Sequence, residues 1–189
     1  MRIALFGGSF NPPHVGHVMV AAWILESGRA DEVWLVPAAH HAFGKALAPF
    51  DARVEMLRAA FAPLGARVRV SEIENEREGV SYTIDTVETL RARHPEHTWL
   101  LVVGTDILGE RTKWKEWDRL QTLVTLLPVR RAGVNGSEPD PDPAHPTPLF
   151  PDISSTQIRE RIARGEDVSG LVPAGALSVV AARKLYRSG

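Results

Sequence analysis

Near the beginning of the chain, an apolar run passes directly into a segment rich in glycine and histidine. Residues 3–6 read Ile-Ala-Leu-Phe, and residues 7–17 read Gly-Gly-Ser-Phe-Asn-Pro-Pro-His-Val-Gly-His. A short apolar run that stops at Gly7 indicates a buried strand, and apolar residues at helical spacing from Val15 onward indicate a helix. The chain is therefore predicted to begin with a strand, a turn and a helix.

The predicted turn has the properties of an anion-binding site. The first turn of a helix carries N–H groups without intrahelical partners, and the helix dipole favours negative charge there. Gly7 and Gly8 lack a Cβ atom, which allows close approach between the backbone and a ligand. His14 and His17 are three residues apart, so on a helical turn both imidazoles would face the same ligand.

Strand and helix patterns alternate along the rest of the chain. The predicted strands span residues 2–6, 32–36, 67–73, 99–103 and 123–129, with a short edge strand that ends at Phe150. The predicted helices span residues 15–28, 51–61 (capped by Asp51), 83–93, 113–120, 154–164 and 173–185. This alternation predicts an α/β fold of Rossmann-like type, a doubly wound parallel sheet with helices on both faces.

The length of the chain suits a single domain that spans residues 1–189. Residues 133–148 are rich in proline, glycine and aspartate, and they are predicted to form a flexible surface loop. Too few residues follow this loop to build a second core. No apolar run reaches the length of a membrane span, so we expect a cytoplasmic protein. The sequence does not decide whether the chain forms a homo-oligomer.

The charge balance and the residue types exclude several classes of function. The formal net charge is −1, which gives no sign of a nucleic-acid partner. The chain has no cysteine, which excludes disulfides, thiolate metal sites and cysteine nucleophiles. A zinc site at His14 and His17 would need a third protein ligand, so no metal centre is expected there. His94 and His97 flank Pro95 in a polar turn, where a solvent-exposed surface is expected.

A second polar segment, Ile-Ser-Ser-Thr-Gln-Ile-Arg at residues 153–159, stands at the start of a predicted helix. Ser154 and Gln157 fit a capping box, which explains a helix start. Capping alone does not require three successive hydroxyl residues followed by Arg159. Hydroxyls, helix N–H groups and a guanidinium together suit phosphate oxygens.

The two polar segments are predicted to meet. In an open parallel sheet, ligands bind beyond the carboxyl ends of the strands, where the strand order reverses. Two anion-binding helix ends that face one crevice would hold a chain of phosphates.

Both polar segments resemble the motifs of a known superfamily. Residues 7–17 resemble the H-x-G-H signature of the nucleotidyltransferases, and residues 153–159 resemble their second phosphate motif, ISSTxxR. Three further segments narrow the resemblance to the bacterial nicotinate-nucleotide adenylyltransferases: residues 81–86 (Ser-Tyr-Thr-Ile-Asp-Thr), Gly104-Thr105-Asp106 and the pair Trp114 and Trp117. The similarity extends from Arg2 to about Tyr186.

The resemblance implies a transfer of AMP from ATP, with Mg²⁺, to nicotinate mononucleotide, which gives deamido-NAD and pyrophosphate. The implied catalytic residues are His14, His17 and Arg159. The implied ATP-binding residues are Gly7, Gly8, Ser9, Phe10, His14, His17, Gly104, Asp106, Ile153, Ser154, Ser155, Thr156 and Arg159. The implied acceptor-binding residues are Lys45, Thr83, Trp114 and Lys115. Neighbouring phosphates would favour the protonated form of both imidazoles.

One segment departs from the family pattern, and two other functions remain open. Residues 37–45 read Pro-Ala-Ala-His-His-Ala-Phe-Gly-Lys where relatives often carry Pro-Pro-His-Lys. Lys45 would replace the basic residue of that pattern, but the altered spacing leaves open how His40, His41 and Lys45 contribute. The acceptor could instead be nicotinamide mononucleotide or phosphopantetheine. A carboxylate needs only hydrogen-bond donors, whereas an amide also needs an acceptor. The remaining alternative is a nucleotide-binding regulator without catalysis.

Overall fold

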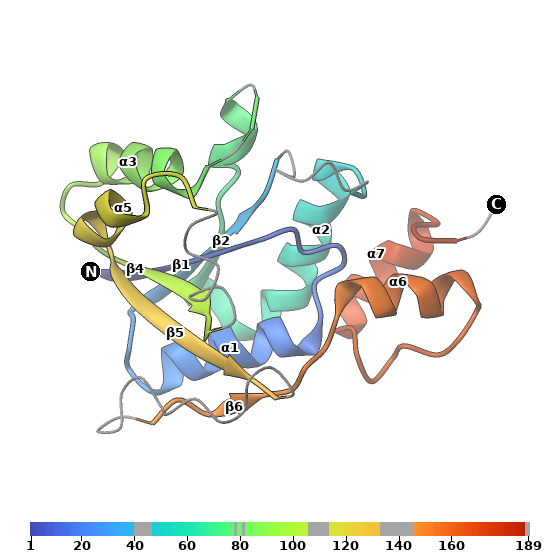
Figure 1. Cartoon of the computed structure of the whole chain (residues 1–189). Helices are drawn as coiled ribbons and strands as arrows, with labels where there is room; N and C mark the ends of the chain where they lie inside the picture. Colours follow the sequence, from blue (N-terminus) through green and yellow to red (C-terminus); the bar gives the residue numbers. More distant parts are fainter. Residues whose placement is uncertain (40–46, 78, 81, 106–113, 133–145, 188–189) are drawn as a thin grey trace.

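A six-stranded parallel sheet forms the centre of the molecule, with strand order β3-β2-β1-β4-β5-β6 (Figure 1). The computed structural model describes residues 1–39, 47–77, 79–80, 82–105, 114–132 and 146–187. The strands are β1 (Arg2–Gly8), β2 (Glu32–Pro37), β3 (Val68–Val70), β4 (Thr98–Gly104), β5 (Thr125–Arg131) and β6 (Leu149–Phe150). The helices are α1 (Val15–Glu26), α2 (Phe50–Phe61), α3 (Thr83–Arg93), α5 (Trp117–Leu123), α6 (Ser155–Ala163) and α7 (Ala174–Ala182), with two 3₁₀ helices, η1 (Ala62–Arg67) and η2 (Ile73–Glu76).

Alternate residues of the central strands enter two separate cores. Ala4 and Leu35 face a core that is closed by α1, α2 and α7. Ile3, Leu5 and Trp34 face a second core, which α3 and α5 cover. Because successive side chains of a strand point to opposite faces, a sheet that is buried on both sides needs continuous apolar strands. The predicted doubly wound α/β fold is confirmed.

The strand order reverses between β1 and β4, which are neighbours at the centre of the sheet. Connections from β1 run to one side and connections from β4 run to the other, so their carboxyl ends frame a crevice. The loop that follows β1 therefore lies at the position where a ligand is expected.

Several predicted boundaries differ from the structure. The helix predicted over residues 113–120 begins at Trp117, so Trp114 precedes it. The strand predicted over residues 67–73 is shorter, because η2 begins at Ile73. Pro49 and not Asp51 is the N-cap of α2, and Asp51 instead accepts a hydrogen bond from Arg183 at 2.6 Å. The prediction for residues 133–148 falls mainly on 133–145, outside the described residues.

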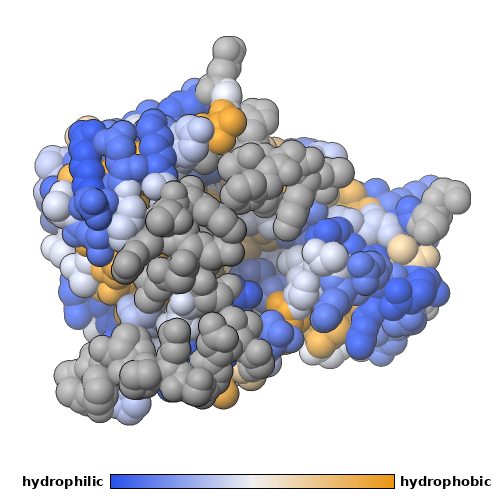
Figure 2. All heavy atoms as spheres, in the orientation of Figure 1, coloured by the Kyte–Doolittle hydropathy of each residue, from blue (hydrophilic) through white to orange (hydrophobic). Residues whose placement is uncertain are grey.

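The two last helices extend the molecule beyond α2 (Figure 1). Helix α7 packs on α2 at a glycine contact: a Cβ atom on Gly175 would lie 2.6 Å from the backbone oxygen of Ala59. Helix α6 begins beside the loop that follows β1. The coloured surface seen in Figure 2 is mostly hydrophilic, with apolar residues in small separate patches. None of the helices in the described part of the chain has both the length and the apolar character that a membrane span requires.

Candidate active site

The loop between β1 and α1, residues 9–14, is held in a buried and unusual conformation. Phe10 has a positive φ of 46°, and this residue is only 1% exposed. Its ring lies 3.3 Å from where a Cβ atom of Gly8 would stand, so the glycine permits this contact. Asn11 is buried as well. The conformation places His14 directly before the first residue of α1.

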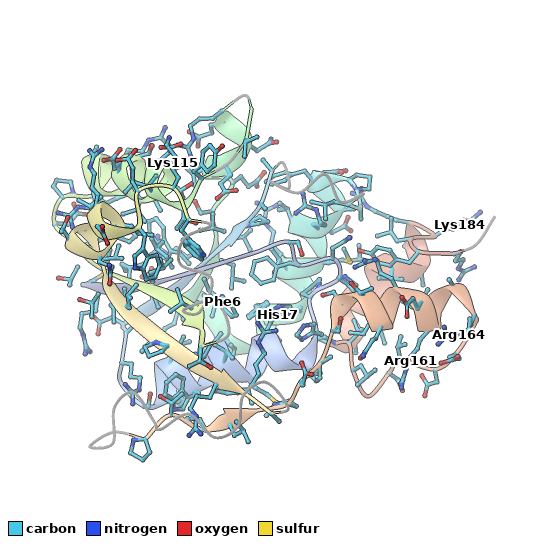
Figure 3. The ribbon with its side chains drawn as sticks, viewed as in Figure 1. Phe6, His17, Lys115, Arg161, Arg164 and Lys184 are labelled. Atoms are coloured by element: carbon cyan, nitrogen blue, oxygen red, sulfur yellow. The ribbon has the colours of Figure 1, made fainter. Side chains whose placement is uncertain are left out.

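The two imidazoles lie on the same side of the turn, as their spacing predicts, and their rings are stacked. The ring centroids of His14 and His17 are 3.6 Å apart, with an interplanar angle of 24°. The Phe10 ring packs on His17 at 4.9 Å, and the Phe6 ring lies 5.8 Å from it (Figure 3). His14 itself is the N-cap of α1, with extended backbone angles. A Cβ atom on Gly16 would lie 3.1 Å from His14 Nδ1, so this glycine leaves room for the His14 ring.

One hydrogen bond assigns the tautomer of His17. The backbone N–H of His14 donates to His17 Nδ1 at 3.1 Å. A ring nitrogen that accepts a hydrogen bond carries no proton, so the proton of neutral His17 is on Nε2. The imidazole of His17 is thereby kept as an N–H donor.

Both histidines are neutral near pH 7 in the nucleotide-free protein. Burial, with the nearby Arg131 charge, lowers the pKa of His14 to about 4. Burial also lowers the pKa of His17 well below its ordinary value, and His14 and Arg131 act in the same direction. The protonated state that bound phosphates are expected to favour is therefore not the state of the free protein.

A pocket of about 460 Å³ opens at the carboxyl ends of β1, β4 and β5. The predicted residues that line it are Gly7, Gly8, Ser9, His14, His17 and Gly104. Phe10 does not line the pocket, because its ring is packed against His17 in the buried loop. Arg131, the last residue of β5, lines the pocket, although no sequence motif predicts it. A guanidinium and two N–H-bearing imidazoles in one crevice make an anion-binding site.

The second polar segment contacts the loop of the first, as predicted. Ser155 Oγ donates to the backbone oxygen of Pro12 at 2.9 Å, and the guanidinium of Arg159 donates to that of Asn11 at 2.8 Å. Asn11 Oδ1 in turn accepts from the hydroxyl of Tyr186 at 2.8 Å. Three side chains from the end of the chain thus anchor the loop that precedes the stacked imidazoles.

These contacts change the roles that the sequence suggests. The hydroxyl hydrogen of Ser155 is engaged with Pro12, so this residue positions the loop in the free protein. Ser154 is an N-cap, but its Oγ accepts from the N–H of Thr156, not from Gln157 as a capping box requires. Arg159 bonds Asn11 and Thr156 and still has further N–H donors, since a guanidinium carries five.

The start of α1 is less open to anions than its sequence predicts. The N–H of Val15 donates to the backbone oxygen of Leu171 at 2.9 Å, and the N–H of His17 donates to that of His14 at 3.0 Å. Two N–H groups of the first turn are therefore already paired. The side chains of His14 and His17 line the pocket at this end of the sheet, together with that of Arg131.

Two of the predicted acceptor residues lie at the same edge of the sheet. Thr83 is the first residue of α3, which runs back from this edge to the start of β4. Trp114 follows the end of β4 and packs edge-on against Trp117, at 5.5 Å between ring centroids. The side chain of Lys115 is paired with Asp85 at 3.0 Å and lies over the Tyr82 ring (Figure 3). Lys45, Asp106, His40 and His41 lie outside the described residues.

Acidification is expected to destabilise the protein through its buried histidines. In the unfolded chain His14 binds a proton below about pH 6.5, whereas in the folded protein it does so only below about pH 4. The free energy of unfolding therefore decreases as the pH is lowered from 6.5 to 4. For His14 alone the loss approaches about 3 kcal/mol. Urea unfolding of the wild type and of His14→Gln between pH 4.5 and 7.5 measures this contribution of His14 to the free energy of unfolding. Equal pH slopes in the two proteins would contradict the assignment of a neutral, buried His14.

Comparison with known proteins gives concordant matches. A family model described as cytidylyltransferase-like matches residues 5–161. A probable nicotinate-nucleotide adenylyltransferase of Anaeromyxobacter dehalogenans is 50% identical, over 98% of this chain and 97% of that protein. Its counterpart in Myxococcus xanthus is 41% identical, over 98% and 95% of the two chains. Among solved structures, a Plasmodium falciparum nicotinic acid mononucleotide adenylyltransferase complexed with NaAD is similar, with a TM-score of 0.78, 20% identity and coverage of 98% and 97%.

Proposed function

Because this chain belongs to the cytidylyltransferase-like family, and within it to the nicotinate-nucleotide adenylyltransferases, we propose that it transfers AMP from ATP to nicotinate mononucleotide. The products are deamido-NAD and pyrophosphate. The observation that best supports this proposal is the stacked pair of His14 and His17, which faces a pocket beside Arg131 at the strand-order reversal.

The reaction needs alignment and charge stabilisation more than proton transfer. An oxygen of the acceptor phosphate, already mostly dianionic near pH 7, forms a bond to the α-phosphorus of ATP. The bond from the α-phosphorus to the bridging oxygen breaks, and its electron pair leaves with pyrophosphate. Groups that hold both anions in line and stabilise the charge on the phosphates can therefore account for catalysis.

The side chains of the pocket suit this task. His17 would donate its Nε2–H to a phosphate oxygen, because Nδ1 is occupied as an acceptor. Arg131 would add a second donor from β5, and the remaining N–H groups of Arg159 would hold the leaving phosphates from the α6 side. A bound triphosphate would raise the pKa of both imidazoles again, since anions favour their charged form.

Mg²⁺ would enter with the nucleotide. The described residues that line the pocket include no carboxylate, which is the side chain that Mg²⁺ prefers. Mg²⁺ commonly keeps its waters and binds through substrate phosphates, and this arrangement fits a pocket lined by one guanidinium and two imidazoles. When bound, it neutralises part of the charge on the phosphates.

Acceptor choice would be made at the α3 side of the crevice. Thr83 offers a hydroxyl, Trp114 offers a ring for stacking on the pyridine, and the backbone N–H at Lys115 offers a donor for the carboxylate. Donors alone satisfy a carboxylate but leave the N–H₂ group of an amide unpaired. The acid form of the pyridine nucleotide would therefore be favoured.

A pyrophosphate-release assay tests the proposal. Purified protein is given ATP and Mg²⁺ with nicotinate mononucleotide, nicotinamide mononucleotide or phosphopantetheine. We expect turnover on the acid at least tenfold above turnover on either alternative, with stoichiometric deamido-NAD. Higher turnover on one of the other two acceptors would mean that this acceptor, and not nicotinate mononucleotide, is the substrate. Nucleotide binding without pyrophosphate from any acceptor would instead indicate a regulator.

A further inference from the structure

The turn between α3 and β4 places two histidines and a glutamate side by side. The sequence is His94-Pro95-Glu96-His97. The N–H of His97 donates to the backbone oxygen of His94 at 3.2 Å, and Pro95 stands at the second position, as in a β-turn. The N–H of His94 is also bonded, to the oxygen of Leu90 at 2.9 Å. The backbone that carries the three side chains is therefore fixed at both ends.

Two buried tryptophans contact the imidazole rings. The expected solvated surface is found at His94, which is 37% exposed, but not at His97, whose ring lies largely against the tryptophans. Trp34 packs edge-on against His94 at 5.2 Å and against His97 at 6.2 Å. Trp99 packs on His97 at 5.7 Å. The two imidazoles are parallel within 5°, with centroids 5.6 Å apart, and the His97 side chain is only 14% exposed. The orientation of the His97 ring is thus set before any ligand arrives.

We propose that His94, Glu96 and His97 form a binding site for one divalent transition-metal ion of the zinc class. Glu96 Oε1 lies 3.3 Å from His97 Nε2 and 3.8 Å from His94 Nδ1. The three donor atoms all lie within 4.8 Å of one another. Tetrahedral Zn²⁺ with bonds near 2.0–2.1 Å separates its ligands by about 3.3 Å. Because the donor atoms lie up to 4.8 Å apart, closing the site around an ion requires the half-exposed His94 ring, as well as the exposed Glu96 side chain, to rotate toward His97. Water would complete the coordination.

The donor set decides which ions bind. Two imidazoles and one carboxylate suit Zn²⁺, Cu²⁺, Ni²⁺ or Co²⁺, whereas Mg²⁺ and Ca²⁺ prefer oxygen ligands. His97 Nδ1 is buried and has no hydrogen-bond partner among the described residues. Ligating imidazoles usually donate their second N–H to an acceptor, and loss of such a partner typically weakens binding by about 10–100-fold. We therefore expect binding about 10–100-fold weaker than at a site whose imidazoles all have such partners.

The site is separate from the pocket of the proposed reaction. His97 directly precedes β4, so the turn lies at the amino end of this strand, while the pocket lies at the carboxyl ends. A metal here would link the end of α3 to the start of β4. Its expected effect is on thermal stability, with adenylyl transfer unchanged.

Metal titration of untagged, nucleotide-free protein tests the proposal. We expect one Zn²⁺ or Cu²⁺ per chain by calorimetry, with nitrogen hyperfine coupling from imidazole in the Cu²⁺ spectrum. Cu²⁺ is also expected to quench tryptophan fluorescence, because Trp34 and Trp99 contact the two rings. At a hundredfold excess over the dissociation constant, Zn²⁺ should raise Tm by about 5–10 °C.

Two variants and one control locate the site. His94→Gln and Glu96→Gln change side chains that solvent reaches, and each should weaken Zn²⁺ binding at least tenfold while the metal-free Tm stays unchanged. The double variant His14→Gln/His17→Gln removes the other described imidazole pair and should bind Zn²⁺ as the wild type does. Wild-type affinity in His94→Gln, or loss of binding only in the His14/His17 variant, would overturn the proposal. These experiments measure Zn²⁺ binding alone, so their outcomes do not depend on whether the protein catalyses adenylyl transfer.

Discussion

Replacing His17 with alanine is expected to lower the turnover number for adenylyl transfer by about 10²–10³-fold. The variant loses one preorganised donor, and removal of such a donor typically costs about 2.7–4 kcal/mol in the transition state. His17 is in the first turn of α1, and its backbone bonds remain possible in alanine. Of its side-chain hydrogen bonds in the structure, only that from the His14 N–H is lost, so the fold should be retained. Pyrophosphate release under saturating ATP and acceptor gives the turnover number.

A glutamine variant separates two explanations for such a loss. The amide nitrogen of the introduced glutamine can stand near the Nε2 position, so His17→Gln restores a neutral donor but not a positive charge. We expect His17→Gln to recover at least tenfold of the lost turnover, because the tautomer of free His17 is a neutral Nε2–H donor. No recovery would mean that the imidazolium charge is needed. Near-normal turnover in His17→Ala would remove His17 from the catalytic set.

Arg53→Met is expected to lower the free energy of unfolding by about 3 kcal/mol. The variant leaves two backbone oxygens without a hydrogen-bond donor, and each buried acceptor without a donor costs about 1–3 kcal/mol. Arg53 is 1% exposed, and its guanidinium donates to the backbone oxygens of Ser9 and Ala48, each at 3.0 Å. Methionine retains most of the apolar stem of the side chain. Urea unfolding at pH 7 measures the change. The KM for ATP should rise as well, because Ser9 belongs to the loop before the imidazoles.

Arg58→Met is the matched control for Arg53→Met. Arg58 stands on the same helix, but its side chain is 63% exposed and pairs with Glu72 on the surface. Exposed ion pairs contribute about 0–1 kcal/mol, so this variant should stay close to wild type. If the free energy of unfolding falls equally in both variants, the buried hydrogen bonds of the Arg53 guanidinium are not what stabilises the loop of residues 9–14.

The sequence predicts the layers of the fold well, because apolar periodicity is a local property. Continuous apolar runs mark the central strands, and residues 83–93 are predicted and observed as one helix. Side-chain contacts between segments that are far apart in the sequence cannot be predicted from local periodicity. Arg131 stands in no motif, and only the placement of β5 beside β4 brings it to the pocket. A cationic residue at the carboxyl end of a predicted strand is the signal that could have found it.

Roles within a motif are also harder to predict than the motif itself. The prediction that residues 153–159 meet the loop after β1 is confirmed. That the hydroxyl of Ser155 bonds Pro12 could not be predicted, since the hydroxyl suits a phosphate equally well. Arg53 escapes prediction for a related reason: a charged residue in an amphipathic helix is normally exposed, and its two acceptors lie in other segments. The predicted placement of Trp114 on a helix is wrong, because α5 begins three residues later.

The anchoring of the β1–α1 loop by Ser155, Arg159 and Tyr186 has a consequence for biosynthesis. A ribosome that has translated β1 to β5 has produced both histidines and most of the sheet, but none of these three anchors. The nascent chain can therefore begin to fold while its nucleotide site is still unsupported. The loop gains all three contacts only after the last residues of the chain have left the exit tunnel.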